Sequence, residues 1–138
     1  MTRTSRQIQG DIYQFLKDSD LSEIISGEIY RNGMRPRDSK AEDAVVTFVT
    51  GTIGDVQSGY VVVNIYVNDV DPWSNGVLVE DSARTEEIER AADQWVESLT
   101  CARSNYKFGL ASAIQTFEEP SINQHFVSVR LRYDYWNN

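Results

Sequence analysis

Two segments in which apolar side chains strictly alternate with other side chains constrain the fold of this chain most. Residues 60–68 (YVVVNIYVN) place four aliphatic side chains on one face of an extended strand and Tyr60 and Tyr66 on the other. Residues 124–136 alternate over a longer stretch. A strand of this kind covers a core with one face and leaves the second face for water or a partner. The sequence therefore predicts an antiparallel sheet containing both strands, with helices packed on one face.

The remaining elements follow from helical spacing and from short runs of β-branched and aromatic residues. Apolar residues at helical spacing predict a first helix capped by Ser5 and a second helix over residues 85–100, with three glutamates in its first turn. We further expect a short helical piece over residues 21–25 and strands over residues 29–30, 44–50 and 111–118. The predicted fold class is α+β, with a mostly antiparallel sheet of about four or five strands and two helices on one face, in a single domain of residues 1–138.

The composition is that of an ordinary globular protein. The chain has 138 residues, of which 41% are hydrophobic and 25% charged, a balance that argues against disordered and fibrous classes. No apolar run approaches the ~20 residues of a membrane-spanning helix, and the first ten residues lack the apolar stretch of a signal peptide. The single cysteine, Cys101, cannot form an internal disulfide. We therefore expect a soluble protein without a membrane partner that folds in a reducing cytosol.

The charge is concentrated in the middle of the chain. Residues 41–100 carry twelve acidic and two basic residues, whereas the two flanking segments are almost balanced. A protein that grips duplex DNA needs a basic stripe to neutralise phosphates, so this distribution argues against that class. The dense basic cluster lies in residues 31–40, which we expect to form a loop of mixed charge. Such a loop fits either contact with an acidic partner surface or simple exposure to solvent. Its arginines are Arg31, Arg35 and Arg37.

Side chains that would carry catalysis or bind metal do not form a known motif. The only histidine, His125, stands at the start of a predicted strand, where we expect a surface residue rather than a general base. Cys101 follows the second predicted helix and does not stand at a helix start, which is the position typical of a reactive cysteine. Acidic residues gather in a loop at Asp69, Asp71, Glu80 and Asp81, but their spacing does not match an EF-hand, and we favour a solvated loop over a metal site. We predict no enzymatic activity, no catalytic residue and no cofactor.

Aromatic and arginine side chains on the second face of the two long strands are the candidate contacts. The alternation places Tyr60 and Tyr66 on that face of one strand and Arg130, Arg132 and Trp136 on that face of the other. Solitary exposed aromatic residues are common, but a sheet face that combines several with arginine suits a partner. We therefore interpret this face as a surface for oligomer or partner contacts.

The order of these elements resembles the tail-completion proteins of tailed bacteriophages, also called tail terminators. A leading helix runs into LSEIISGEIYRNGMRPRDSKAEDAVVTFVTG, in which a small apolar segment, a loop and a strand with apolar first residues follow one another. The long strand YVVVNIYVN, a helix with small and aromatic core residues (IERAADQWVESL) and closing strands complete the pattern. The resemblance covers nearly the whole chain and rests on order and pattern.

The resemblance implies a structural virion protein that forms a ring, commonly a hexamer. Such a ring sits on the head-proximal end of the tail tube, stops polymerisation of the tube protein and offers a docking surface to the head–tail connector protein. Assembly would take place in the host cytoplasm, and DNA would pass without specific binding. If part of the acidic segment lines the lumen, Asp69, Asp71, Glu80 and Asp81 would repel that DNA.

Three alternatives remain open from the sequence. One alternative is another neck or head–tail connector component. The chain is also compatible with a small monomeric adaptor that binds a partner through the 31–40 loop, or with a hydrolase that uses Asp and Glu residues and an added metal. A ring protein should associate with itself through the sheet, whereas an adaptor should stay monomeric.

Overall fold

The two long alternating segments pair with each other along their whole length and form the centre of a sheet. In a computed structural model that describes residues 2–101 and 104–137, strand β3 (Val56–Asn68) runs antiparallel to strand β6 (Gln124–Trp136). Each strand is 13 residues long, and their ends lie opposite each other, Val56 beside Trp136 and Asn68 beside Gln124. The predicted bounds of β6 are confirmed, while β3 begins four residues earlier than predicted.

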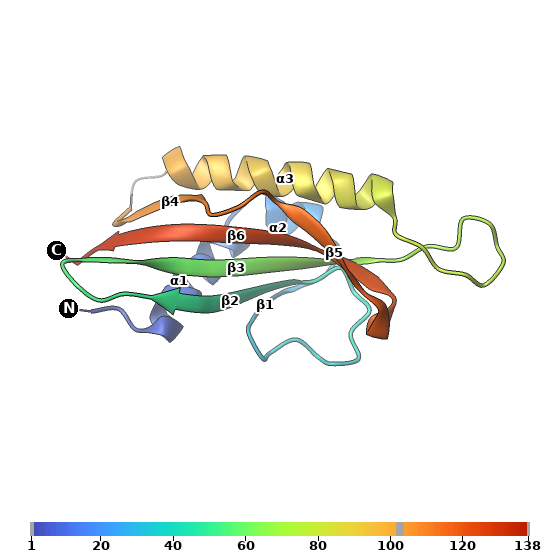
Figure 1. The fold of residues 1–138 in the computed structure, drawn as a ribbon, viewed down its shortest axis with the longest axis horizontal. Helices are drawn as coiled ribbons and strands as arrows, with labels where there is room; N and C mark the ends of the chain where they lie inside the picture. Colours follow the sequence, from blue (N-terminus) through green and yellow to red (C-terminus); the bar gives the residue numbers. More distant parts are fainter. Residues whose placement is uncertain (1, 102–103, 138) are drawn as a thin grey trace.

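The sheet has six strands over the described residues, in the order β1-β2-β3-β6-β4, and β5 also pairs with β6 (Figure 1). All neighbouring strands are antiparallel except β1 and β2. The mostly antiparallel α+β class is therefore confirmed, and the strand count of four or five is corrected to six. The other elements are α1 (Ser5–Lys17), α2 (Leu21–Ile24), β1 (Ile29–Arg31), β2 (Ala44–Gly51), α3 (Ser82–Cys101), β4 (Tyr106–Leu110), β5 (Gln115–Glu119) and the short 3-10 helix η1 (Pro120–Ile122).

The strand missing from the prediction is β4, and the strand predicted over residues 111–118 is shifted. β4 and β5 occupy successive parts of the same edge of β6, β4 opposite residues 131–135 and β5 opposite residues 124–128. Residues 111–114 are the bend between them. β4 is a short segment with Lys107 and Gly109, which gives a weak local signal. Tertiary contacts hold it, because Tyr106 and Phe108 both pack on Phe15 of α1 and the Tyr106 hydroxyl donates a hydrogen bond to Asp11 of α1.

Helices α1 and α3 pack on one face of the sheet and together bury its core. Helix α1 lies against β1 and β2, and α3 lies against β4, β5 and β6. Apolar residues of both helices join those of the central strands in one cluster. The fully buried members of this cluster include Ile8, Ile12, Leu16, Val61, Val63, Ile65, Ile88, Val127, Val129 and Leu131. In Figure 1, α1 and α2 lie behind the sheet and α3 runs along its upper edge beside β4, and no α-helix is drawn across the strands on the side toward the viewer.

Both long helices begin at residues other than those predicted. Thr4, rather than Ser5, caps α1: its hydroxyl accepts a hydrogen bond from the Gln7 N–H, and the Gln7 side chain accepts one from the Thr4 N–H. Helix α3 begins at Ser82, so its first turn contains no acidic residue and the three predicted glutamates lie further along. Asp81 accepts a hydrogen bond from the Arg84 N–H at this start, which is the geometry of a side-chain cap. The cap, and not the glutamates, satisfies the first free N–H groups.

Within the described part of the chain, no helix is both long enough and apolar enough to cross a membrane.

A close approach of β2 to β3 at Gly59 gives the first testable prediction. A methyl group on residue 59 would overlap the carbonyl oxygen of Thr50, which follows an irregularity in the β2–β3 register. Gly109 is also in a strand, but a methyl group there would have no neighbour within 4 Å. Gly59→Ala should therefore lower the free energy of unfolding by ~2 kcal/mol, as measured by urea denaturation. Gly109→Ala is the matched control, and an equal loss in both variants would contradict the prediction.

Candidate interaction surfaces

The face of the sheet opposite the helices is uncovered along much of its length and carries a row of aromatic rings. Tyr66 on β3, Phe126 on β6 and Phe117 on β5 lie side by side, with 5.6 Å between the ring centroids of each neighbouring pair. The first pair is in direct register across the sheet, as is the second. We call this helix-free side the open face. Phe117 is exposed at its edge, so the row ends in an apolar surface open to solvent.

Arginine side chains occupy the other end of the open face, toward the C-terminus of β6. Arg130 lies opposite Val62 and has its guanidinium 5.5 Å from the ring centroid of Tyr60. Arg132 lies opposite Tyr60 and its side chain is 62% exposed. Trp136, the last residue of β6, is an exposed aromatic residue. The predicted alternation thus brings four of the predicted contact residues together on one half of the open face.

Arg35 lies among contacts within the chain. Its Nε is 2.9 Å from Asp43 Oδ2, and its Nη2 donates to the side chain of Gln124 at 3.1 Å. The guanidinium also lies 4.0 Å from the ring centroid of Tyr66, so it extends the aromatic row across the sheet. The Arg35 side chain is 12% exposed and that of Asp43 is 1% exposed. Arg35 therefore fastens the 32–43 loop over the end of the sheet, where it is not free for an external partner.

Asp43 is an ionised carboxylate held by several donors. Burial raises its pKa, but hydrogen bonds from the Ser39 hydroxyl, the Glu28 N–H and Arg35, together with the charge of Arg35, lower the pKa below its ordinary value of 3.8. The neighbouring Glu42 is paired in the same way with Arg84 at the start of α3. Two adjacent carboxylates thus connect the loop to two separate parts of the fold.

The other two arginines predicted as contacts of the 31–40 loop differ from Arg35. Arg31 closes β1 and lies 4.9 Å from the ring centroid of Tyr13 on α1, which places it on the helix side of the sheet. Arg37 is exposed, and in the described part of the chain it forms no ion pair. The structure therefore does not bring Arg31, Arg35 and Arg37 together into one basic patch.

Each carboxylate of the acidic 69–81 loop has a contact within the chain. Asp69 Oδ1 is 2.6 Å from His125 Nδ1, and the Asp71 carboxylate accepts hydrogen bonds from the N–H groups of residues 75 and 76. Glu80 accepts a hydrogen bond from the Thr85 hydroxyl at 2.7 Å, and Asp81 caps α3. His125, predicted to be a surface residue, instead lies half-buried between Asp69 and Glu80. These carboxylates shape the loop as well as giving it charge.

Large apolar side chains are exposed on two projections at opposite ends of the molecule. At one end, the hairpin between β2 and β3 carries Ile53, which is 83% exposed. At the other end, the 69–81 loop extends beyond the sheet (Figure 1) and carries Trp73, which is 69% exposed, with Val77 and Leu78 beside it in sequence. None of these residues was among the predicted contacts, although a tryptophan inside a polar and acidic loop is a signal that the sequence contains.

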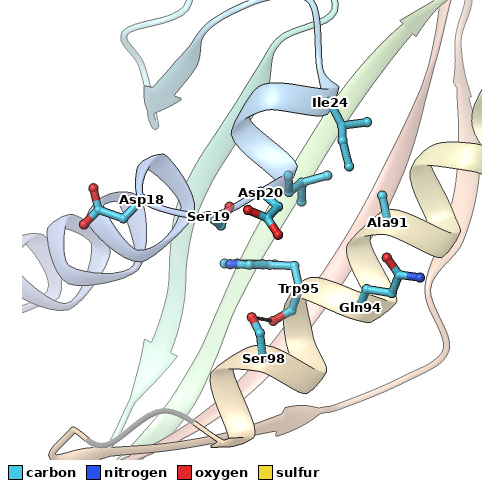
Figure 2. A pocket seen from close by; sticks show the side chains of 9 residues that line it. Asp18, Ser19, Asp20, Ile24, Ala91, Gln94, Trp95 and Ser98 are labelled. Carbon is cyan, nitrogen blue, oxygen red and sulfur yellow. Dashed lines mark hydrogen bonds between the residues drawn. The ribbon is translucent and has the colours of Figure 1, made fainter.

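A pocket of about 290 Å³ lies between the α1–α2 turn and α3 (Figure 2). Asp18, Ser19 and Asp20 line one side, and Trp95 and Ser98 line the other. The Ser98 hydroxyl donates to the carbonyl of Trp95, and the Trp95 indole N–H has no hydrogen-bond partner among the described residues. No histidine or cysteine lines this pocket, so it holds no pairing of a nucleophile with an imidazole base.

Side chains that ligate metals are not gathered at one point. Among residues 2–101 and 104–137, no group of three or more His, Cys, Asp or Glu side chains is arranged to hold a metal ion. Cys101 is the last residue of α3 and is exposed as a free thiol.

Comparison of the sequence with models of protein families gave no match, and comparison with curated proteins gave none either.

The burial of Arg35 predicts that two arginines of one loop differ in their effect on stability. Arg35→Ala leaves the Asp43 carboxylate buried without its cation, which should lower the free energy of unfolding by ~3 kcal/mol. Arg37→Ala removes an exposed side chain and should change it by less than ~0.5 kcal/mol. Urea denaturation of both variants measures the difference. Equal stability of the two variants would show that Arg35 does not clamp the loop.

The lowered pKa of Asp43 predicts a contribution to stability that depends on pH. Because its pKa is lower in the folded protein than the ordinary 3.8, this contribution is fully present above that value and is lost as the pH falls through the folded pKa. Asp43→Asn should lose less stability than the unsubstituted protein between pH 6 and about pH 3, as measured by thermal unfolding. Asp38→Asn, at an exposed position of the same loop, is the control. Parallel curves for Asp43→Asn and the unsubstituted protein would refute the prediction.

Proposed function

We propose that this chain is a structural protein of a tailed bacteriophage, a tail terminator that assembles into a ring on the head-proximal end of the tail tube. The ring, with six copies as its commonest size in the family that the sequence resembles, would end polymerisation of the tube protein and join the tail to the head–tail connector protein. Its place would be the virion, after assembly in the host cytoplasm. No enzymatic activity and no cofactor belong to this function.

The observation that carries the proposal is the pair of apolar projections at opposite ends of the sheet. Ile53 on one projection and Trp73 on the other are large apolar side chains exposed to solvent. When a partner covers exposed apolar groups of this size, their removal from water lowers the free energy of the complex. A terminator must contact the tube on one side and the connector on the other, and this molecule offers one apolar contact at each end.

The two layers of the domain provide the remaining contacts that a ring needs. In a closed ring, one surface of each copy meets a different surface of the next. The open face with Tyr60, Tyr66 and Arg130 is one such surface, and the exposed side of helix α3 is another. A single copy leaves both of them accessible.

The lumen of the ring would be lined in part by acidic residues. The 69–81 loop projects from the sheet and carries Asp69, Asp71, Glu80 and Asp81, and each is partly exposed. Negative charge along the lumen would repel the phosphates of passing DNA, so DNA would slide without specific binding. The hydrogen bonds of these carboxylates within the chain also fix the conformation of the loop.

The alternative of a monomeric adaptor receives less support. That function would rest on the basic cluster of the 31–40 loop, but Arg35 is engaged with Asp43 and Arg31 lies on the other side of the sheet. A neck or connector component would use the same exposed surfaces as a terminator. A terminator and a neck or connector component differ in the position at which the ring binds in the virion, so that position distinguishes the two functions.

Light scattering and electron microscopy with isolated tail tubes test the proposed function. We expect a mass of several subunits in solution or a ring that caps one end of each tube. One of the two variants Trp73→Ser and Ile53→Ser, the one whose projection contacts the tube, should reduce capping at least tenfold, because it removes apolar area from that contact. The other variant should cap tubes normally, because its projection contacts the connector. Met34→Ser, which removes an exposed apolar side chain elsewhere, is the matched control. A monomer that does not bind the tubes would refute the terminator and favour the adaptor.

A further inference from the structure

An acidic groove runs along one edge of the molecule on the helix side of the sheet. It lies between α3 and the bend that joins β4 to β5 and has a volume of about 420 Å³. Glu86, Glu89 and Asp93 of α3 form its acidic side, and Leu110 and Ile114 form its apolar side. Three carboxylates therefore face an apolar side, which is the arrangement that receives a long cationic side chain with an apolar stem.

One cation already lies in this groove and does not neutralise it. Arg90 is 3.6 Å from Glu86 in an ion pair along the exposed surface of α3. Exposed pairs of this kind contribute little energy and are easily rearranged. Glu89 accepts a hydrogen bond from the Thr116 hydroxyl, which fixes its position at the groove. The groove keeps a surplus of negative charge.

The arginine half of the open face has the opposite character. Arg130 is exposed above the ring of Tyr60, and the nearest carboxylate oxygen to Arg132, on Asp134, is at 3.9 Å. Asp134 is itself engaged, since it accepts a hydrogen bond from the Ser58 hydroxyl. This half of the face therefore presents two cations and an aromatic ring to solvent. Such a set fits an acidic, partly apolar site.

We propose that the arginine half of the open face binds the acidic groove of a second copy of this chain. The proposal deepens the proposed function and rests on it, since it names the two surfaces through which the ring would close. The surfaces lie on different sides of one domain, so each copy uses both and association continues from copy to copy. The arginine stems cover Leu110 and Ile114, and the guanidinium groups pair with Glu86 and Asp93.

Charge also argues against the alternative in which two open faces pair with their arginine halves together. That arrangement would bring Arg130 and Arg132 of one copy toward those of the other, and like charges at an interface oppose association. Two acidic grooves repel each other for the same reason. Head-to-tail contact is the arrangement in which both surfaces meet their opposite.

Reciprocal charge reversal tests this pairing. One variant carries Arg130→Glu and Arg132→Glu, and the other carries Glu86→Lys and Asp93→Lys. Each variant alone has two surfaces of the same sign, so we expect its self-association, measured by analytical ultracentrifugation and on tail tubes, to fall at least tenfold. In an equimolar mixture each reversed surface meets its opposite on the other variant, and assembly should return as alternating rings.

A matched control separates this effect from a change in net charge. Arg6→Glu with Lys17→Glu, at exposed positions of α1, changes the net charge by the same amount as the first variant and should leave association unchanged. Circular dichroism and thermal unfolding establish that every variant is folded. If the unsubstituted protein and both variants assemble alike, the pairing is wrong and the terminator proposal stands. If the unsubstituted protein never assembles, both proposals fail.

Two further outcomes would overturn the pairing specifically. If each variant loses assembly but the mixture does not recover, these two surfaces do not meet each other. If the first variant assembles normally but loses binding of a labelled oligothymidylate of about 20 nucleotides, the open face binds single-stranded nucleic acid by stacking and charge instead.

Discussion

The pairing of β3 with β6 is the constraint on which the rest of the structure depends. Both strands are 13 residues long and lie in register from end to end, so their alternation places their buried apolar side chains on the same side. A shift of one residue would move Val61, Val63 and Ile65 to the solvent side and remove the surface on which the helices pack. The other strands add to the edges of this pair. The core, the open face and the two projecting ends all follow from that register.

Two adjacent ion pairs connect the irregular segments to this frame. Glu42 accepts two hydrogen bonds from Arg84 at the start of α3, and Asp43 pairs with Arg35 of the preceding loop. Arg84 also donates to the carbonyl of Ile24, so α2 and α3 share one contact. Both carboxylates are buried, and each would be costly to bury without its arginine. Because Arg35 is paired with Asp43, it is not available at the surface. The candidate contact residues therefore lie on the open face and at the two ends, and not in the 31–40 loop.

The sequence predicted part of the candidate surfaces and missed the rest for a physical reason. Period-two alternation was enough to place Tyr60, Tyr66, Arg130, Arg132 and Trp136 on one face, because the side of a strand is a local property. Whether an arginine side chain is available to a partner depends on contacts with distant parts of the chain, so it is not a local property. Arg35 meets Gln124, which is 89 residues away in the chain, and no spacing rule predicts that contact. Exposure of Ile53 and Trp73 depends likewise on how far the hairpin and the 69–81 loop extend beyond the sheet.

By itself, the sequence determined the two central strands, the helix over most of residues 82–101 and the class of fold, because a period of 2 or 3.6 residues fixes which side chains share a face. Only the tertiary structure decided that β4 and β5 share one edge of β6, since β4 has a weak signal of its own and is held by the packing of Tyr106 and Phe108 on Phe15 of α1. It also decided which charges pair inside the chain and which stay exposed. The free energy of these ion pairs comes from contacts between segments far apart in the sequence, and only the folded chain brings those segments together.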